Sequence, residues 1–290
     1  MPELPEVQTT VDGLNRTVRG KIIRNVWSEY KSKNYKNKEE IKNPKYFKKF
    51  KEEVVGKKIL NAERRAKNIL IHLSGRKTIL VHMKMTGHLL FGDYDKSDPF
   101  NAHIRLRFDL SGGKNLYFSD MRKFAKVTLI NTADLETSPH LNHLGPEPLE
   151  PSFKLEAFSF ELLKRSRGKI KQVLMDQTII VGIGNIYSDE ILWRANVHPL
   201  SKVGKIPKKN LRLMFKAMKE VLKRGIDLGG DSMSDYRNID GKRGKFQDQH
   251  KAYQKHKTKC LKRGCKGVLE RTVVGGRGAH FCPKHQKLFV

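Results

Sequence analysis

Residues 181–187 read VGIGNIY. They follow one segment, 169–176, and lead into the start of another, 185–195, and the apolar spacing of both segments predicts helices. The two glycines permit a tight double turn, and Asn185 is a good N-cap for the helix that follows. Free backbone amides at such a helix start form an anion site that suits a phosphate. A plain helix–turn–helix connection explains the same residues equally well.

The charge of the chain shifts this balance toward a phosphate. The 290 residues include 59 Lys and Arg against 30 Asp and Glu, a formal net charge of +29. A charge of that size indicates a polyanionic partner, with nucleic acid as the first candidate. An acidic membrane surface comes second, but the sequence contains no long apolar run or signal-like segment to support it.

The N-terminus carries a second candidate site, in the residues MPELPE at positions 1–6. Removal of Met1 would leave Pro2 as a free secondary amine beside the carboxylate of Glu3. An amine nucleophile next to a proton shuttle is what imine chemistry needs, and a free α-amine titrates near about 8. Pro5 and Glu6 also suit the first turn of a helix, so the residues alone favour an ordinary helix start.

The pattern of apolar residues predicts an α+β protein of several domains. We expect an N-terminal β-sandwich with one helix in 1–135, a linker in 136–152, a helical domain in 153–250 and a metal-binding hairpin in 251–290. The expected helices are 5–18, 153–165, 169–176, 185–195 and 207–223. The expected strands are 21–27, 59–64, 69–73, 78–83, 88–91, 104–110, 115–119 and 126–130. The Lys-rich stretch 31–58 reads as a solvated loop or short helix, and 225–250 as a mobile loop.

All three cysteines follow residue 259, which argues against a disulfide framework and for a metal site. Cys260 and Cys265 form one close pair, and Cys282 and His285 form another. Two such pairs can meet to give Zn²⁺ three thiolates and one imidazole, a closed structural site. His280 is the alternative to His285 as fourth ligand, and we prefer His285 because Cys-Pro-x-His makes a tight knuckle.

Between the two ligand pairs lie residues 275–278, GGRG, a composition that is typical of a hairpin tip. Such a tip projects the side chain of Arg277, and the glycines let another backbone approach closely. A phosphate is the natural partner of an exposed arginine on a basic protein. A plain turn with a solvated arginine is the alternative.

Together these segments resemble the formamidopyrimidine-DNA glycosylase family, or 8-oxoguanine DNA glycosylases, of the helix–two-turn–helix superfamily. The resemblance covers nearly the whole chain. Its motifs are MPELPE at 1–6, RRAKNILIHL at 64–73, HMKMTGHLL at 82–90, DMRKF at 120–124, LGPEPL at 144–149, IKQVLMDQ at 170–177, GIGNIYSDEIL at 182–192, GGDSMSDYRNIDGKRGKFQ at 229–247 and GGRGAHFCPKH at 275–285.

The resemblance implies a bifunctional DNA glycosylase and AP lyase of base excision repair, acting on oxidised purines and abasic sites in double-stranded DNA. It implies that Pro2 attacks C1′ of the damaged nucleotide to form a Schiff base, with Glu3 moving protons, before β- and δ-elimination. Lys67 joins them as a catalytic residue near the flanking phosphate. Glu6 and Lys171 are implied to support the active site.

The resemblance also implies a set of DNA-binding residues. Met85, Arg122 and Phe124 would fill the gap that a flipped base leaves in the stack. The segment 229–247 corresponds to a flexible loop that closes over 8-oxoguanine. The full DNA-binding set is His82, Met85, Arg122, Phe124, Asn185 and Arg277. The implied protein is a monomer with one structural Zn²⁺, working on the nucleoid in a bacterial-type cytoplasm, with no membrane partner.

The chain departs from the family pattern at several positions. His285 stands where the last zinc ligand is usually Cys, and Met83-Lys84-Met85 stands for Leu-Gly-Met. Ser232, Met233 and Ser234 precede Asp235 where the family often has Arg, so lesion preference is the weakest part of the resemblance. A non-catalytic binder of damaged DNA or RNA, and an RNA-associated zinc protein, are the competing classes. The N-terminal proline and glutamate favour the enzyme.

Overall fold

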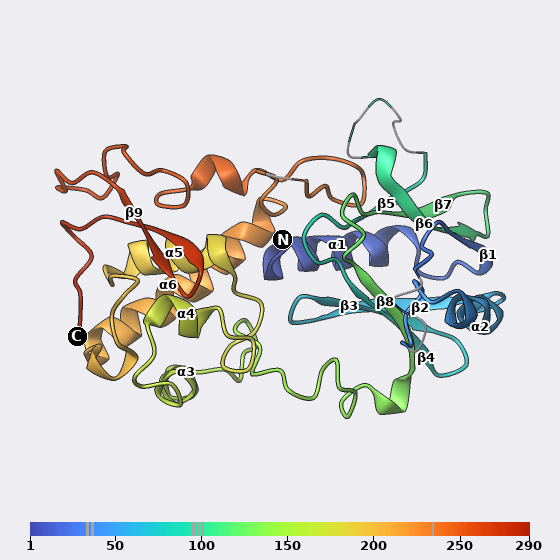
Figure 1. The fold of residues 1–290 in the computed structure, drawn as a ribbon, viewed down its shortest axis with the longest axis horizontal. Helices are drawn as coiled ribbons and strands as arrows, with labels where there is room; N and C mark the ends of the chain where they lie inside the picture. Colours follow the sequence, from blue (N-terminus) through green and yellow to red (C-terminus); the bar gives the residue numbers. More distant parts are fainter. Residues whose placement is uncertain (33–34, 36–37, 94–96, 98, 100, 234) are drawn as a thin grey trace. The chain divides into compact units, whose positions relative to one another are not determined.

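Two four-stranded antiparallel sheets organise the first half of the chain (Figure 1). One sheet has the strand order β1-β6-β7-β5 and the other the order β2-β3-β4-β8. The computed structural model describes residues 1–32, 35, 38–93, 97, 99, 101–233 and 235–290. The strands are β1 Ile23–Ser28, β2 Ile59–Arg65, β3 Asn68–Leu73, β4 Lys77–His82, β5 His88–Phe91, β6 Ile104–Leu110, β7 Asn115–Ser119 and β8 Lys126–Asn131.

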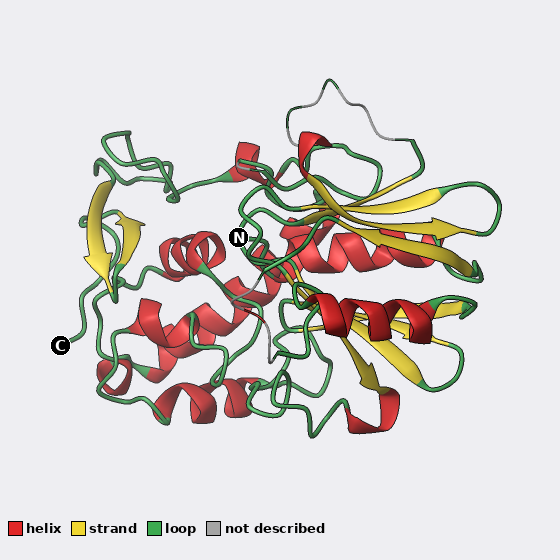
Figure 2. Cartoon of the chain, turned by 45° about the vertical axis from the view of Figure 1, so that its right-hand side comes forward, coloured by secondary structure: helices red, strands yellow, loops and turns green. Residues whose placement is uncertain are grey.

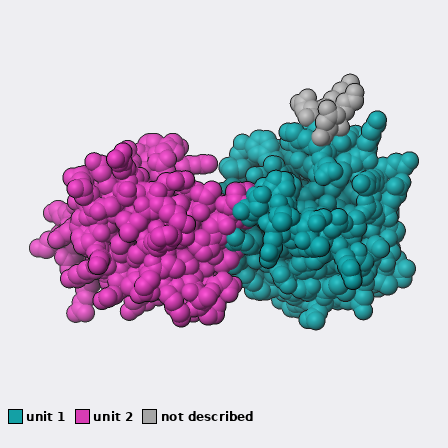
Figure 3. Space-filling model, turned by 90° about the horizontal axis from the view of Figure 1, so that it is seen from below, with its two compact units in different colours: residues 1–142, 228–245 teal, residues 143–227, 246–290 magenta. Residues whose placement is uncertain are grey.

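The chain divides into two units, which Figure 3 shows in different colours. Unit 1 holds residues 1–142 together with 228–245, and unit 2 holds 143–227 together with 246–290. The expected domain limits at 135, 152 and 250 stay a prediction. Every expected strand of the sandwich is present, with ends that shift by at most two residues.

The core of unit 1 is built from side chains that alternate along the strands. Ile69 and Ile71 of β3, and Ile79 and Val81 of β4, are at most 2% exposed and belong to one hydrophobic cluster. Residues two apart on a strand share a face, so these four point to the same interior. Burying each such side chain stabilises the fold by about 1.5–3 kcal/mol.

Helix α1, Leu4–Thr17, covers β2 and β3 with one apolar face. Val7, Val11 and Leu14 lie on this face at helical spacing and are buried in the same cluster as the strands. The expected N-terminal helix is therefore confirmed. Figure 2 shows the sheets as two yellow layers with helices beside them.

The Lys-rich stretch 31–58 is less solvated than its composition suggests. It forms helix α2, Pro44–Val54, in which Phe50 and Val54 are almost fully buried in the core of unit 1. The expected helix is confirmed, but the expectation of a solvated segment is wrong for these residues. Apolar side chains at helical spacing, separated by lysines, face the sandwich. Residues 33–34 and 36–37 lie outside the described part of the chain.

The glycine-rich segment 228–245, which lies in the stretch expected to form a mobile loop of the helical domain, packs within unit 1. Ile239 is 2% exposed in the core cluster, and its backbone carbonyl accepts a hydrogen bond from Phe91 N–H at 2.9 Å. A Cβ on Gly13 of α1 would lie 2.4 Å from Ile239 Cγ2, so the helix must have glycine there. Ser234 of this segment lies outside the described residues.

Unit 2 combines helices with one β-hairpin, as the sequence predicts. Helix α5 contacts α4, α6 and strand β10. The elements are α3 Leu155–Leu163, α4 Ile170–Leu174, α5 Asn185–Ala195, α6 Lys208–Asp227, β9 Glu270–Val274 and β10 Arg277–Phe281. Short 3-10 helices are η2 Asn101–His103, η3 Thr132–Asp134, η4 Val203–Lys205 and η5 Phe246–Gln249. In the described residues, none of the helices has the length and apolar character needed to cross a membrane.

Replacing Ile239 with alanine tests the packing of segment 228–245. We expect Ile239→Ala to lower the free energy of unfolding by about 2–4 kcal/mol, because it leaves a cavity beside α1. Met233→Ala in the same segment is the control, since Met233 is 42% exposed and should change stability by less than about 0.5 kcal/mol. Urea unfolding measures both. Equal stability of the two variants would contradict the packing.

Candidate functional site

Pro2 and Glu3 lie at the buried start of α1. Glu3 is 2% exposed, and Pro2 is buried as well. Glu3 and Glu6 cap each other: the Glu3 side chain accepts from the Glu6 backbone N–H, and Glu6 Oε2 accepts from the Glu3 N–H at 2.7 Å. This reciprocal box satisfies two N–H groups that the helix start would otherwise leave unpaired.

The second oxygen of Glu6 binds the segment that returns from the other end of the chain. Glu6 Oε1 accepts a hydrogen bond from the backbone N–H of Asp231 at 2.7 Å. Gly230 makes this approach possible, because it has a φ of +85° and an added Cβ would lie 3.0 Å from Glu6 Cγ. The hydroxyl of Tyr236 donates to the Glu6 carbonyl at 3.0 Å. One carboxylate thus joins the N-terminus to segment 228–245.

Lys67 and His82 lie near each other at one end of the sheet β2-β3-β4-β8. Ala66 and Lys67 form the two-residue turn between β2 and β3, in which Ala66 has a φ of +56°. The Lys67 side chain is 5% exposed. His82 ends β4, pairs across the ladder with Asn68, and its Nδ1 accepts from the Lys84 backbone N–H at 3.0 Å. Burial and the charges of nearby lysines lower the pKa of His82 to about 3. The ring is therefore neutral near pH 7, with its proton on Nε2.

The loops β4–β5 and β7–β8 are tied together by the buried carboxylate of Asp120. Its Oδ1 accepts from the Thr86 hydroxyl at 2.8 Å, and its Oδ2 accepts from the Tyr30 hydroxyl and the Ala125 N–H, each at 2.9 Å. Burial and this carboxylate raise the pKa of Tyr30, so the phenol remains a donor. Leaving one such buried partner unpaired costs about 1–3 kcal/mol, so the two loops move little relative to each other.

The three residues of the expected wedge extend from these two loops. Met85 is 36% exposed in one loop, and Phe124 is 49% exposed in the other. The guanidinium of Arg122 lies 4.6 Å from the centre of the Phe124 ring, a cation–π contact, and its backbone N–H donates to Thr86 Oγ1 at 3.2 Å. Exposed apolar side chains held on a tied pair of loops can enter a gap in a base stack.

In unit 2, Lys171 of α4 is fully buried in a polar network. Its Nζ donates to Asp189 Oδ1 at 2.5 Å, to Ser188 Oγ at 3.2 Å and to the Asn185 carbonyl at 3.3 Å. Asp189 Oδ2 accepts from the His280 backbone N–H at 3.0 Å. The ammonium has used its three donors, so its role is to hold α4, α5 and the hairpin strand β10 together.

The turn before α5 differs in one detail from the expectation. Gly184 is the N-cap, and Asn185 is the first residue of the helix. The Gln177 side chain holds the turn, because it donates to the Ile183 carbonyl at 2.9 Å and accepts from the Gly182 N–H at 2.8 Å. Asn185 Oδ1 is buried and has no hydrogen-bond partner among the described residues. The asparagine therefore caps nothing, and Gly184 takes that place with a φ of −135° and a ψ of −148°.

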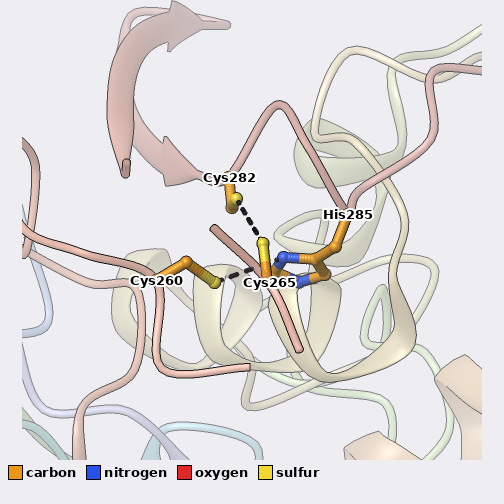
Figure 4. A group of neighbouring side chains, drawn as sticks. All are labelled: Cys260, Cys265, Cys282 and His285. Carbon is orange, nitrogen blue, oxygen red and sulfur yellow. Dashed lines mark hydrogen bonds between the residues drawn. The ribbon is translucent and has the colours of Figure 1, made fainter. Parts of the chain in front are cut away.

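Three cysteines and one histidine form a group that could hold a metal ion (Figure 4). The ligand atoms of Cys260, Cys265, Cys282 and His285 all lie within 4.8 Å of one another. His285 Nδ1 lies 3.3 Å from Cys260 Sγ, while its Nε2 lies 3.1 Å from the Trp193 carbonyl. That second contact fixes the tautomer that presents Nδ1 to a metal.

Of His280 and His285, it is His285 that lies with the three sulfurs. His285 belongs to the group, whereas His280 Nδ1 lies 2.9 Å from Asp189 Oδ2. A Cβ on Gly267 would lie 2.5 Å from Cys282 Sγ, and the Gly267 N–H donates to Cys265 Sγ at 3.4 Å. The sulfurs are thus packed closely by backbone, as a closed four-ligand site requires.

Arg277 lies at the tip of the hairpin, as expected. Gly275 and Gly276 form a two-residue turn, with φ of +56° and +74°, between Val274 and Arg277. Positive φ at both positions matches the twist of a tight hairpin and favours glycine. Arg277 is exposed at the start of β10. The turn therefore presents the guanidinium to solvent.

Comparison with known proteins gives the family. Residues 1–127 match the model of the formamidopyrimidine-DNA glycosylase N-terminal domain, and residues 144–237 match that of the formamidopyrimidine-DNA glycosylase H2TH domain. The chain belongs to the formamidopyrimidine-DNA glycosylase family. A formamidopyrimidine-DNA glycosylase of Pediococcus pentosaceus is 38% identical over 288 residues, which cover 99% of this chain and 100% of that protein.

Solved structures of formamidopyrimidine-DNA glycosylases (Fpg) have the same fold. The Lactococcus lactis Fpg, in complex with DNA that contains an abasic site, aligns with a TM-score of 0.84 at 30% identity and covers 97% of this chain and 98% of that chain. The Fpg of Thermus thermophilus aligns with a TM-score of 0.82 at 34% identity, covering 97% of both. The expected family and fold class are confirmed.

Three carboxylates of the site had no signal in the sequence. Asp120 ties the wedge loops, Asp189 holds Lys171, and Glu190 binds the segment before the metal site. Glu190 Oε1 accepts from the backbone N–H groups of Ala252 at 2.9 Å and Tyr253 at 2.8 Å. Their partners are distant in sequence, so no local spacing could mark these residues. They are marked only as members of the longer motifs at 120–124 and 182–192.

Removing one cysteine tests the metal site. We expect the protein to carry one metal ion per chain and Cys282→Ala to lose it, because three ligands hold a metal less tightly than four. His285→Cys should keep the metal, since a thiolate is an equivalent ligand. His280→Gln is the matched control and should also keep it. Metal content of dialysed protein measures this, and loss in the His280 variant would contradict the assignment.

The low pKa of His82 predicts a pH dependence of stability. The folded ring stays neutral down to about pH 3, whereas an unfolded histidine binds a proton near about 6.5. The unfolded state therefore binds more protons below about pH 6.5, and stability falls as pH falls toward about 3. Between pH 7 and 5, we expect the free energy of unfolding of His82→Gln to fall by up to about 2 kcal/mol less than that of the parent.

Urea unfolding at the two pH values measures this difference. His143→Gln is the control, because His143 is exposed. An identical pH dependence in the parent and the His82 variant would show that the ring binds a proton as readily in the folded state as in the unfolded state.

Proposed function

We propose that this chain is a bifunctional DNA glycosylase and AP lyase of base excision repair, which removes oxidised purines from double-stranded DNA. The observation that carries this is the buried Pro2-Glu3 pair at the start of α1, held by Glu6. The family supports it. Related Fpg structures from L. lactis are complexes with DNA containing an abasic site or Fapy-dG.

The proposed chemistry uses the N-terminal amine once Met1 is removed. The Pro2 nitrogen forms a bond to C1′ as the glycosidic bond breaks, and the base leaves with a proton. The C1′–O4′ bond then opens to give an iminium ion, with Glu3 protonating O4′. Loss of a C2′ proton expels the 3′ phosphate, and a second elimination expels the 5′ phosphate.

The DNA-binding roles follow from exposure and charge. Met85, Arg122 and Phe124 are proposed to fill the gap left by the flipped nucleotide. Asn185 and Arg277 are proposed to bind phosphates. These assignments rest on the exposed wedge side chains and on the turns that present the two polar residues.

The two lysines have different proposed roles. Lys67 is proposed to act beside the lesion, near the flanking phosphate and close to the neutral ring of His82. Lys171 is proposed to position the Asn185 turn, because its ammonium is used within the buried network. In this proposal Lys67 contacts the DNA and Lys171 acts only through the turn.

The metal is proposed to be a single structural Zn²⁺, held by Cys260, Cys265, Cys282 and His285. Three sulfurs and one imidazole nitrogen are the donors that Zn²⁺ accepts in closed tetrahedral sites. The ion would fix the hairpin that carries Arg277 and would supply no chemistry to the reaction. Because its proposed substrate is chromosomal DNA, we propose a bacterial-type cytoplasmic protein associated with the nucleoid.

Borohydride trapping tests the nucleophile. With DNA containing 8-oxoguanine opposite cytosine, we expect a reduced covalent adduct that mass spectrometry places on Pro2. Glu3→Gln should slow base release by about 10²–10⁴-fold, because it removes a general acid–base group. Pro2→Gly should keep part of the lyase activity, since glycine also provides a free amine.

The control is the same protein with an uncleaved N-terminal tag. Its Pro2 nitrogen is an amide, so it should bind lesion DNA and form no adduct. Full activity of the tagged form would refute Pro2 as the nucleophile. Binding without nicking by the processed form would instead identify a non-catalytic binder of damaged DNA.

A further inference from the structure

Lys84 has a backbone conformation that does not suit a lysine. It lies between His82 and Met85 in the loop β4–β5, and its φ is +54°, in the left-handed region that favours glycine. Its backbone N–H donates to His82 Nδ1, which any residue except proline would also do. The backbone therefore gives no reason for lysine here, so the ammonium group needs an explanation.

Three ammonium groups act on the neutral ring of His82. The ladder register places Lys126 of β8 directly opposite His82, and opposite residues share a face with Cβ atoms about 5 Å apart. Lys67 lies in the turn that ends at Asn68, the partner of His82 on the other side. The charges of Lys84, Lys67 and Lys126 all lower the pKa of His82. Positive charge thus gathers next to the wedge residue Met85.

The nearby negative charge does not balance this cluster. Lys84 is partly buried, and burial, Lys126 and Lys42 lower its pKa while Glu40 raises it. Glu40 Oε1 already lies 3.0 Å from Lys42 Nζ, in a buried ion pair. Among the charged groups that shift the pKa of Lys84, Glu40 is therefore the one carboxylate, and it is shared with Lys42. An anion bound between Lys84 and Lys126 would relieve the repulsion.

We propose that Lys84 and Lys126 form an additional binding site for a DNA phosphate beside Met85, next to His82, which the sequence already predicts as a DNA contact. The inference rests on the proposed function, since its ligand is the backbone of the DNA that the wedge enters. Two ammonium groups supply point charges, and the neutral imidazole supplies a directed N–H donor. The site would hold the strand next to the gap that Met85 fills.

The experiment replaces Lys84 with glycine, which suits a φ of +54°. Binding is measured across a salt series, on a duplex with an uncleavable tetrahydrofuran abasic-site analogue. We expect Lys84→Gly to bind several-fold more weakly at low salt and to reduce the slope of log affinity against log salt by about 0.9. Its thermal unfolding temperature should equal or exceed that of the parent, because glycine removes strain.

Arg76→Gly is the matched control. Arg76 also has a positive φ, +58°, and lies in the turn at the other end of the β3–β4 hairpin from His82. It should leave the salt slope unchanged. Lys84→Arg should restore the parent slope, because it returns the charge at the same position. Lys126→Ala should reduce the slope by a similar amount to Lys84→Gly.

Two results would overturn the inference. One is a parent-like slope in Lys84→Gly, and the other is an arginine variant that binds as weakly as the glycine variant. Either result, with lesion cleavage by the parent intact, would leave the proposed function standing. A parent protein that neither prefers lesion DNA nor cleaves it would instead remove the proposed function.

Discussion

The N-terminal site depends on the hydrogen bonds that the Glu6 carboxylate accepts. One oxygen holds the backbone of Glu3 beside Pro2, and the other holds Asp231, 225 residues later in the chain. A buried carboxylate with two charge-assisted hydrogen bonds is well satisfied, so it fixes both segments with one group. The position of Pro2, the proposed nucleophile, at a chain end where fraying is common is set in this way.

Unit 1 also has a buried carboxylate that joins two segments at the proposed wedge. The carboxylate of Asp120 joins the two loops from which Met85, Arg122 and Phe124 extend. In unit 2, Asp189 joins α5 to strand β10, and Glu190 joins α5 to residues 251–253, which precede the metal-ligand group. In each place buried acids do structural work, and the net charge of +29 leaves the cations to meet the polyanion.

Local pattern is enough to predict the secondary-structure elements and the metal-ligand group. The alternation along β3 and β4, the helical spacing of α1 and the paired metal ligands depend on residues close in sequence. The Lys-rich helix α2 was harder to interpret, because Phe50 and Val54 are few among many lysines. The sequence predicts a mobile loop for segment 228–245, because its glycines indicate turns. It carries no sign that the segment packs within unit 1.

The sequence by itself determined the family, the sandwich strands, the hairpin and the presence of a proline and a glutamate at the N-terminus. Only the tertiary structure decided that Glu6 binds Asp231, that His285 and not His280 faces the three sulfurs, and that Lys171 is buried. The physical reason is the separation along the chain between the residues that interact. Spacing records which residues share a face or a turn, whereas a hydrogen bond between distant segments leaves no period in the sequence.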